Sequence, residues 1–170
     1  MSVSLRFMLR HPAHAIALGF GSGLAPRAPG TVGTLWAWAA FVLLETGFGP
    51  LPWAALLVAG LLVGVWACTL CARHMGMADP GAIVWDEILA FWALLWLIGP
   101  AGVWPQLLAF ALFRFFDATK LGPVGWADRL FKPAPGAAVG WAQGVGILFD
   151  DLVAALCTLL VMALLSPLWT

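Results

Sequence analysis

The chain has 170 residues, of which 63% are hydrophobic and 9% are charged, with a formal net charge of +0 and a mean hydropathy of +0.98. This length fits a single domain spanning residues 1–170. Because the apolar content exceeds that of an ordinary soluble domain, we expect a helical bundle in a lipid bilayer. The balanced charge excludes a nucleic-acid-binding protein, since such proteins need a basic face.

Residues 1–18 carry Arg6 and Arg10 and then a short apolar stretch, which glycines interrupt from Gly19 onward. A secretory signal peptide needs a longer uninterrupted apolar core and a small-residue cleavage site. We therefore expect a short interfacial helix that stays with the protein.

A glycine-rich segment follows from residue 19 to residue 34. A turn of this kind at the start of a helix can present free N–H groups to an anion. It is not a Walker loop, because no Gly-Lys-Ser/Thr follows the glycines. We predict a phosphate-binding segment here, and its candidate residues are Gly21, Ser22, Gly23 and Thr31.

Five apolar runs separated by Gly/Pro clusters predict an all-α integral membrane bundle of about five helices. The runs are Thr31–Leu44, Trp53–Ala72, Ile83–Ile98, Gln106–Phe116 and Val145–Leu165. The second and fifth approach the ~20 residues that cross ~30 Å of hydrocarbon. The first and fourth are short for a full span, so they are expected to be tilted, extended or only partly inserted.

The basic residues predict the topology, with the N-terminus in the cytoplasm. Threading five spans from inside places every Lys and Arg on the cytoplasmic side, which is a positive-inside pattern. The same threading leaves only Glu45 among the acidic residues outside, so the active site is expected at the cytoplasmic face. Tryptophans at the run ends are predicted to mark the interfaces: Trp53, Trp104 and Trp169 outside, and Trp85, Trp126 and Trp141 inside. The histidines, His11, His14 and His74, are expected at the interfacial surface.

Two acidic pairs, Asp86-Glu87 and Asp150-Asp151, stand at the heads of the third and fifth runs. A carboxylate inside a membrane costs roughly 2.5–3.5 kcal/mol on insertion scales, so those that persist usually have a function. Hard oxygen ligands suit Mg²⁺, and we interpret the four acids as a metal site. The alternative is that they cap helix N-termini and compensate the helix dipole.

The basic partners come from the segment Arg114 to Lys120. Arg114 and Lys120 can contact phosphate oxygens, and Asp117, one turn from Arg114, can orient it. The alternative is that both cations only anchor the chain at the cytoplasmic interface.

Four motifs occur in a fixed order along nearly the whole chain. They are Gly19–Pro26 continuing to Pro29-Gly30-Thr31, Asp79-Pro80 with Ile83–Glu87, Phe113–Lys120, and Asp150-Asp151-Leu152. In this order they resemble the phosphatidylglycerophosphatase A family. The chain departs from the family pattern at Leu121, where proline is usual, and in an apparent insertion from Leu130 to Trp141.

The resemblance implies an all-α, Mg²⁺-dependent phosphatase that converts phosphatidylglycerophosphate to phosphatidylglycerol and inorganic phosphate. It implies a multi-pass protein of the bacterial cytoplasmic (inner) membrane, and it leaves the oligomeric state open. Carried onto this chain, it gives Asp86, Glu87, Asp150 and Asp151 as catalytic metal ligands. Catalysis and phosphate binding then also involve Arg114, Asp117 and Lys120, with Arg129 as a further phosphate-binding residue.

The expected nucleophile is a water on the metal with one carboxylate as base, and a phospho-aspartate intermediate is the alternative. Two rival functions stay open: a phosphatase of another lipid phosphomonoester, and a small cation-binding membrane transporter. A transporter predicts acids deep in the helices, whereas these acids cluster at one face.

Overall fold

The computed structural model describes residues 3–132 and 137–165, and its regular structure over these ranges is entirely helical. The elements are α1 (Leu5–Met8), α2 (Pro12–Ala17), the 3₁₀ segment η1 (Gly19–Leu24), α3 (Pro29–Glu45), α4 (Pro50–Met75), α5 (Trp85–Ile98), α6 (Val103–Thr119), α7 (Pro123–Leu130) and α8 (Trp141–Leu165). The all-α prediction is therefore confirmed for the described residues.

Local sequence explains where several helices begin and end. Proline stands in the first turn of α2, α3, α4 and α7, where its fixed φ suits a helix and its missing N–H is not needed. Helix α4 ends at Gly76, whose φ of 66° is the left-handed geometry that stops a helix. The five predicted apolar runs overlap α3, α4, α5, α6 and α8.

The largest difference from the sequence prediction is at the start of α8, which begins at Trp141 and not at Val145. The side chain of Gln143 explains the earlier start, since its Oε1 accepts a hydrogen bond from the Gly140 N–H at 2.6 Å and caps the first turn. Asp150 and Asp151 therefore lie about three turns into the helix, and not at its head. Residues 133–136 of the predicted insertion lie outside the described residues.

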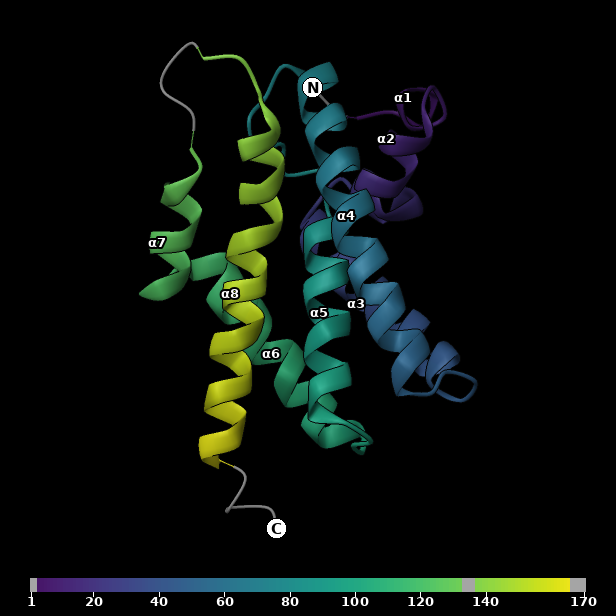
Figure 1. Cartoon of the computed structure of the whole chain (residues 1–170), viewed down its shortest axis with the longest axis vertical. Coiled ribbons are helices and arrows are strands. Elements are labelled where there is room, and N and C mark those ends of the chain that lie inside the picture. Colours follow the sequence, from purple (N-terminus) through teal and green to yellow (C-terminus); the bar gives the residue numbers. More distant parts are fainter. Residues whose placement is uncertain (1–2, 133–136, 166–170) are drawn as a thin grey trace.

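Helix α5 is the centre of the bundle and packs against α3, α4, α6 and α8; Figure 1 shows it between α4 and α8. Phe91, Leu94 and Leu95 are among its fully buried side chains. Two indoles fix it to its neighbours: Trp85 Nε1 donates to the Gly60 carbonyl of α4 at 3.0 Å, and Trp92 Nε1 donates to the carbonyl of Ala37 in α3 at 2.8 Å. A buried indole N–H needs such an acceptor.

Two of the predicted interfacial tryptophans are buried instead. Trp53 is 2% exposed and Trp85 is 6% exposed, because each ring packs among aromatic neighbours of the core. Trp104, Trp126 and Trp141 are exposed, and Trp169 lies outside the described residues.

The prediction of surface histidines is wrong for His14, which is 2% exposed. Its Nε2 lies 2.7 Å from Nδ1 of His74, and its ring stacks on Phe7. This contact joins α2 to the C-terminal end of α4. A second contact joins the end of α2 to the residue before α5: the Val84 N–H donates a hydrogen bond to the carbonyl of Ala17 at 2.9 Å. The N-terminal helices therefore support the segment that enters α5.

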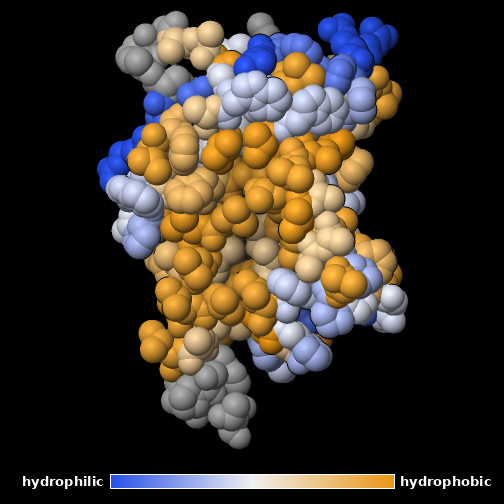
Figure 2. Space-filling model, in the orientation of Figure 1, coloured by the Kyte–Doolittle hydropathy of each residue, from blue (hydrophilic) through white to orange (hydrophobic). Residues whose placement is uncertain are grey.

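The outer surface is largely apolar. Helices α4 and α8 are long and apolar enough to cross a membrane. Large side chains such as Leu51, Leu62 and Leu164 are 80%, 68% and 80% exposed, which is unusual for a protein surrounded by water. Figure 2 shows a broad hydrophobic area in the middle of one face, with hydrophilic residues gathered at the end where α1 and α2 lie.

Candidate active site

Three carboxylates converge where the start of α5 meets the middle of α8. Asp86 and Glu87 stand in the first turn of α5, and Asp151 comes from α8. One oxygen from each of these residues lies within 4.8 Å of the others. Negative charge in the first turn is favoured by the helix dipole, and Val84, the N-cap of α5, makes no side-chain cap that would compete for this position.

The cluster has oxygen atoms without protein partners. Asp86 Oδ1, Glu87 Oε2 and Asp151 Oδ2 are buried and accept no hydrogen bond from any residue that the structure describes. Burying an unpaired carboxylate is expensive, and such groups are normally paired or coordinate a metal. Three convergent carboxylate oxygens can therefore hold a metal ion, and hard oxygen donors favour a hard divalent cation.

Arg114 and Lys120 lie beside this cluster, and Asp117 lies between them. Arg114 Nη1 is 2.5 Å from Asp117 Oδ2 and 3.6 Å from Glu87 Oε1. Lys120 Nζ donates to Asp117 Oδ1 at 3.1 Å. The structure thus brings together both cations and the acid that the sequence proposed as an orienting group.

Asp150 faces Lys120 and not the three-carboxylate cluster. Its Oδ2 accepts a hydrogen bond from Lys120 Nζ at 2.5 Å. Consecutive helical residues point about 100° apart, so the two acids of this pair look in different directions. Asp151 joins Asp86 and Glu87 and lies 3.8 Å from Lys120 Nζ through its Oδ1, while Asp150 forms the shorter ion pair with Lys120.

The ammonium group of Lys120 remains charged in this setting. Burial by itself lowers the pKa of Lys120, but the carboxylates of Asp151, Asp150 and Asp117 together raise it above its ordinary value. The neighbouring carboxylates therefore favour the charged ammonium form of Lys120 at neutral pH.

The glycine-rich segment supports the site without placing its predicted phosphate-binding residues on the acids. Ser22 Oγ donates to the Gly19 carbonyl at 2.8 Å, and Gly23 packs against the carbonyl of Ala82, before α5. Gly21 lies in an open turn with φ 110°, and Thr31 is half-buried at the start of α3.

Gly30 of this segment touches the site, although it was not among the predicted site residues. A Cβ at Gly30 would overlap Glu87 Oε1 and lie 3.1 Å from both terminal nitrogens of Arg114. The start of α3 can approach the acids only because this position has no side chain. The available signal was a Pro-Gly-Thr sequence at the start of an apolar run.

Arg129 is exposed on α7, and it forms no ion pair within the part of the chain that the structure describes. Its predicted contact with phosphate therefore stays a prediction.

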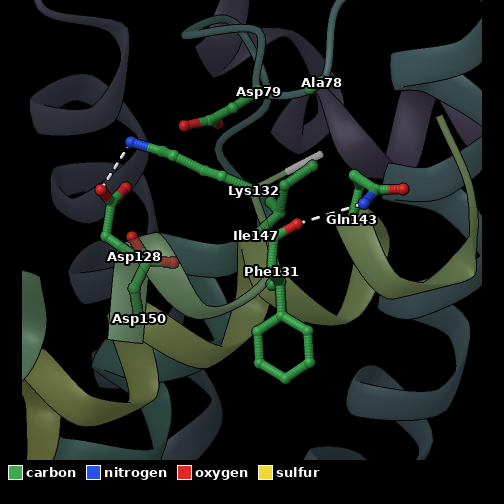
Figure 3. Close-up of a pocket in the computed structure, with 9 residues that line it drawn as sticks. Ala78, Asp79, Asp128, Phe131, Lys132, Gln143, Ile147 and Asp150 are labelled. Atoms are coloured by element: carbon green, nitrogen blue, oxygen red, sulfur yellow. Dashed lines mark hydrogen bonds and ion pairs between the residues drawn. The ribbon is translucent and has the colours of Figure 1, made fainter. Parts of the chain in front are cut away.

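A small cavity borders Asp150. Its volume is about 30 Å³, enough for about two water molecules, and Asp79, Asp128 and Lys132 line it with Asp150 (Figure 3). Lys132 Nζ donates to Asp128 Oδ2 at 2.6 Å. Burial raises the pKa of Asp79, and the nearby charge of Lys120 opposes this shift. Neither Asp79 nor Asp128 was among the predicted site residues.

Comparison with known proteins agrees with the motifs. The family model described as phosphatidylglycerophosphatase A matches residues 15–166. The phosphatidylglycerophosphatase A of Escherichia coli is 34% identical over 168 residues, covering 96% of this chain and 89% of the relative. The Haemophilus influenzae protein of the same name is 36% identical over 157 residues, covering 92% and 90%.

A relative from Bacteroides thetaiotaomicron has a different name. It is 36% identical over 155 residues, covering 87% of this chain and 89% of the relative, and carries a provisional designation as a phosphatidylinositol-3-phosphatase. No solved structure matches the chain at a significant level.

Proposed function

The chain belongs to the phosphatidylglycerophosphatase A family, and on that premise we propose that it removes the terminal phosphate of phosphatidylglycerophosphate at the Asp86–Glu87–Asp151 cluster with Mg²⁺. The products are phosphatidylglycerol and inorganic phosphate. The observation that carries the proposal is the convergence of three carboxylates, each of which has a buried oxygen without a protein donor among the described residues.

The donor set fits magnesium better than a soft metal. All three ligands are carboxylates, and Mg²⁺ is usually bound by one or two carboxylates, waters and substrate phosphate. When bound, the ion would polarise the phosphoryl group and lower the pKa of a coordinated water. Asp86, Glu87 and Asp151 are the residues that would hold it, and Asp150 remains a further predicted ligand.

The chain's own cations supply the rest of the electrostatic stabilisation. Arg114 Nη1 is paired with Asp117, whereas Arg114 Nε is buried without a hydrogen-bond acceptor among the described residues, so the Nε N–H is available to a phosphate oxygen. Lys120 stays charged beside it. Phosphoryl transfer depends mainly on positioning and on neutralising developing charge, and these two side chains are placed for both. A water is the proposed nucleophile, and a carboxylate of the cluster is the proposed base.

The surface supports a lipid substrate reached from the membrane. We place α3, α4, α5, α6 and α8 in the cytoplasmic membrane as a multi-pass bundle, with the N-terminus and the site toward the cytoplasm. An apolar groove of about 430 Å³ on α3, lined by Leu35, Trp38 and Val42 among others, begins about one turn past Gly30. It suits an acyl chain of a lipid whose phosphate reaches the start of the same helix.

The test is phosphate release from phosphatidylglycerophosphate by the purified protein in detergent. We expect release with Mg²⁺, its loss with excess chelator, and its return when Mg²⁺ is restored. Asp86→Ala and Asp151→Ala should abolish release while the protein remains in the membrane fraction. Retained activity in both variants would show that the cluster is not required for the reaction.

Substrate choice is tested in the same assay with phosphatidylinositol 3-phosphate and phosphatidate. The name of the Bacteroides relative makes the first of these a specific competitor. We expect kcat/KM to be highest for phosphatidylglycerophosphate. A higher value for either competitor would reassign the substrate while leaving the phosphatase chemistry in place.

A further inference from the structure

Lys120 occupies an unusual position for a side chain that would only bind substrate. Its Nζ lies 2.5 Å from Asp150 Oδ2, 3.1 Å from Asp117 Oδ1 and 3.8 Å from Asp151 Oδ1. Three carboxylates from two helices therefore surround a single ammonium group. A pocket lined by three carboxylates could hold a second metal ion if the ammonium group were absent.

Asp151 connects this pocket to the three-carboxylate cluster. Its Oδ1 faces Lys120, while its Oδ2 is buried without a hydrogen-bond partner in the described part of the chain. The residue is 2% exposed, so water does not neutralise the second oxygen. One carboxylate thus lies between the proposed metal position and a fixed positive charge, as a bridging carboxylate lies between the ions of a two-metal site.

Carboxylates and positively charged groups alternate around the rest of the site. Asp117 lies between Lys120 and Arg114 through its two oxygens. Glu87 Oε1 then faces Arg114, while Glu87 Oε2 is buried and unpaired. Three carboxylates therefore alternate with three cation positions: the proposed metal, Lys120 and Arg114. A phosphoryl group has three equatorial oxygens over which charge spreads, and this ring provides one cation for each.

The backbone fixes Lys120 in place. It is the C-cap of α6 with φ 49° and ψ 40°, a left-handed conformation that non-glycine residues adopt only when their surroundings require it. Its carbonyl packs against Gly125 of α7, where a Cβ would overlap the oxygen. The position of the side chain is thus determined by the turn between α6 and α7 as well as by its ion pairs.

We propose that Lys120 is the built-in second cation of this site, so that the protein binds one divalent ion per chain and the ammonium group takes the place of a second metal on Asp150 and Asp151. The inference rests on the proposed function, and it specifies the number of metal ions and the role of Lys120. It also gives Asp150 a role different from that of Asp151: it positions Lys120 and does not bind the ion.

Direct Mn²⁺ binding to the purified full chain in detergent tests the proposal without measuring turnover. Mn²⁺ is the probe because its bound and free forms are distinguished by electron paramagnetic resonance. We expect one bound Mn²⁺ per chain in the wild type and in Lys120→Arg. Lys120→Met, which removes the charge and keeps the length, should bind a second Mn²⁺. The double variant Lys120→Met/Asp150→Asn should return to one.

Lys132→Met is the matched control, since Lys132 also pairs with an aspartate at 2.6 Å but lies outside the ring; we expect one bound Mn²⁺ and unchanged phosphatase activity. Lys120→Met should lose about 10²–10³-fold in kcat, the range seen when a transition-state donor is removed. The double variant removes both charges of the Lys120–Asp150 pair and so leaves no unpaired charge at Asp150. It should therefore fold, and its metal stoichiometry can be measured, even if Lys120→Met alone folds poorly.

Two bound ions in the wild type, or one in both Lys120→Met and the wild type, would overturn the proposal. Either result leaves the metal-dependent phosphatase intact, because a divalent ion is still bound. No bound Mn²⁺ in the wild type would instead contradict the metal site itself, and this inference with it.

Discussion

The two acidic pairs look alike in the sequence, yet they occupy different positions in their helices and make different contacts in the fold. Asp86 and Glu87 stand in the first turn of α5, and both belong to the three-carboxylate cluster. Asp150 and Asp151 lie well inside α8, where only Asp151 reaches that cluster and Asp150 binds Lys120. The difference follows from the surroundings, because a first-turn pair can approach a site from the helix end, whereas a mid-helix pair projects in two directions.

This comparison shows that proximity in sequence does not define a shared role for two acids. We propose that Asp151, which has an unpaired buried oxygen, binds the metal, whereas Asp150, which accepts a short hydrogen bond from Lys120, positions that lysine. The variants below separate these two situations, from the largest expected effect to the smallest.

Asp151→Asn, Asp86→Asn and Glu87→Gln should each lower kcat by about 10²–10³-fold or more, because each removes a charge from the proposed metal position. The substitutions keep the side-chain shape, so the fold should be preserved. Phosphate release at saturating lipid measures the effect, with thermal unfolding as the check on folding. Activity within about tenfold of the wild type in all three would contradict the site.

Gly30→Ala should lower kcat/KM by about 10–100-fold, since the new methyl group displaces Glu87 and Arg114, and a shift of about 1 Å at a reacting site can cost 10²-fold. Gly47→Ala is the matched control: a Cβ at Gly47 has no atom within 4 Å in the described structure, and its activity should be unchanged. Equal activity of the two variants would show that the close approach of α3 is not required.

Asp150→Asn should reduce kcat by about tenfold, less than Asp151→Asn, because it loosens Lys120 without removing a metal ligand. Its affinity for Mn²⁺ should stay within about threefold of the wild type. Parallel titrations of Asp150→Asn and Asp151→Asn make the comparison direct. Matching losses of metal affinity in both would restore the four-acid metal site predicted from the sequence.

Acidification should destabilise the fold at a position far from both pairs. Burial lowers the pKa of His14, so the unfolded chain takes up the proton first as the pH falls below the ordinary histidine value of about 6.5. Stability from neutral His14 is complete above that pH and is lost below it. The unfolding temperature should fall between pH 7.5 and pH 5.5, and less so in His14→Gln. Identical slopes would exclude this origin.

Lys132→Ala should have the smallest effect, with activity within about twofold and the free energy of unfolding changed by about 0.5 kcal/mol or less. Its ion pair with Asp128 is short, but the Lys132 side chain is 56% exposed, and exposed pairs contribute little. A large loss of activity would mean that the cavity beside Asp150 takes part in the reaction.

Several features followed from the sequence because they depend on composition and local order. The apolar runs predicted α3 to α6 and α8 closely, since clusters of glycine and proline separate the runs and break the helices there. The motif order from Gly19 to Asp151 indicated the family, and the density of acids on an apolar chain indicated a site.

Other features depended on contacts between distant residues. The sequence could not show that Trp53 and Trp85 are core residues, or that His14 meets His74. Nor could it show that α8 begins before its apolar run, because the Gly140–Gln143 cap lies in a stretch rich in glycine and alanine that follows a Pro-Ala-Pro-Gly breaker.

The sequence by itself determined the helical class, the family and the set of charged residues from which a site could be built, because hydrophobic content and motif order are properties of the chain. Only the tertiary structure decided which of those charges face one another. Whether an aspartate contacts Lys120 or belongs to the three-carboxylate cluster depends on the rotation of its helix. The cluster also depends on the close approach of α3 to Glu87 and Arg114 at Gly30. Both are fixed by packing between segments far apart in the chain, where the direction of a side chain follows from its helix and not from its neighbours in sequence.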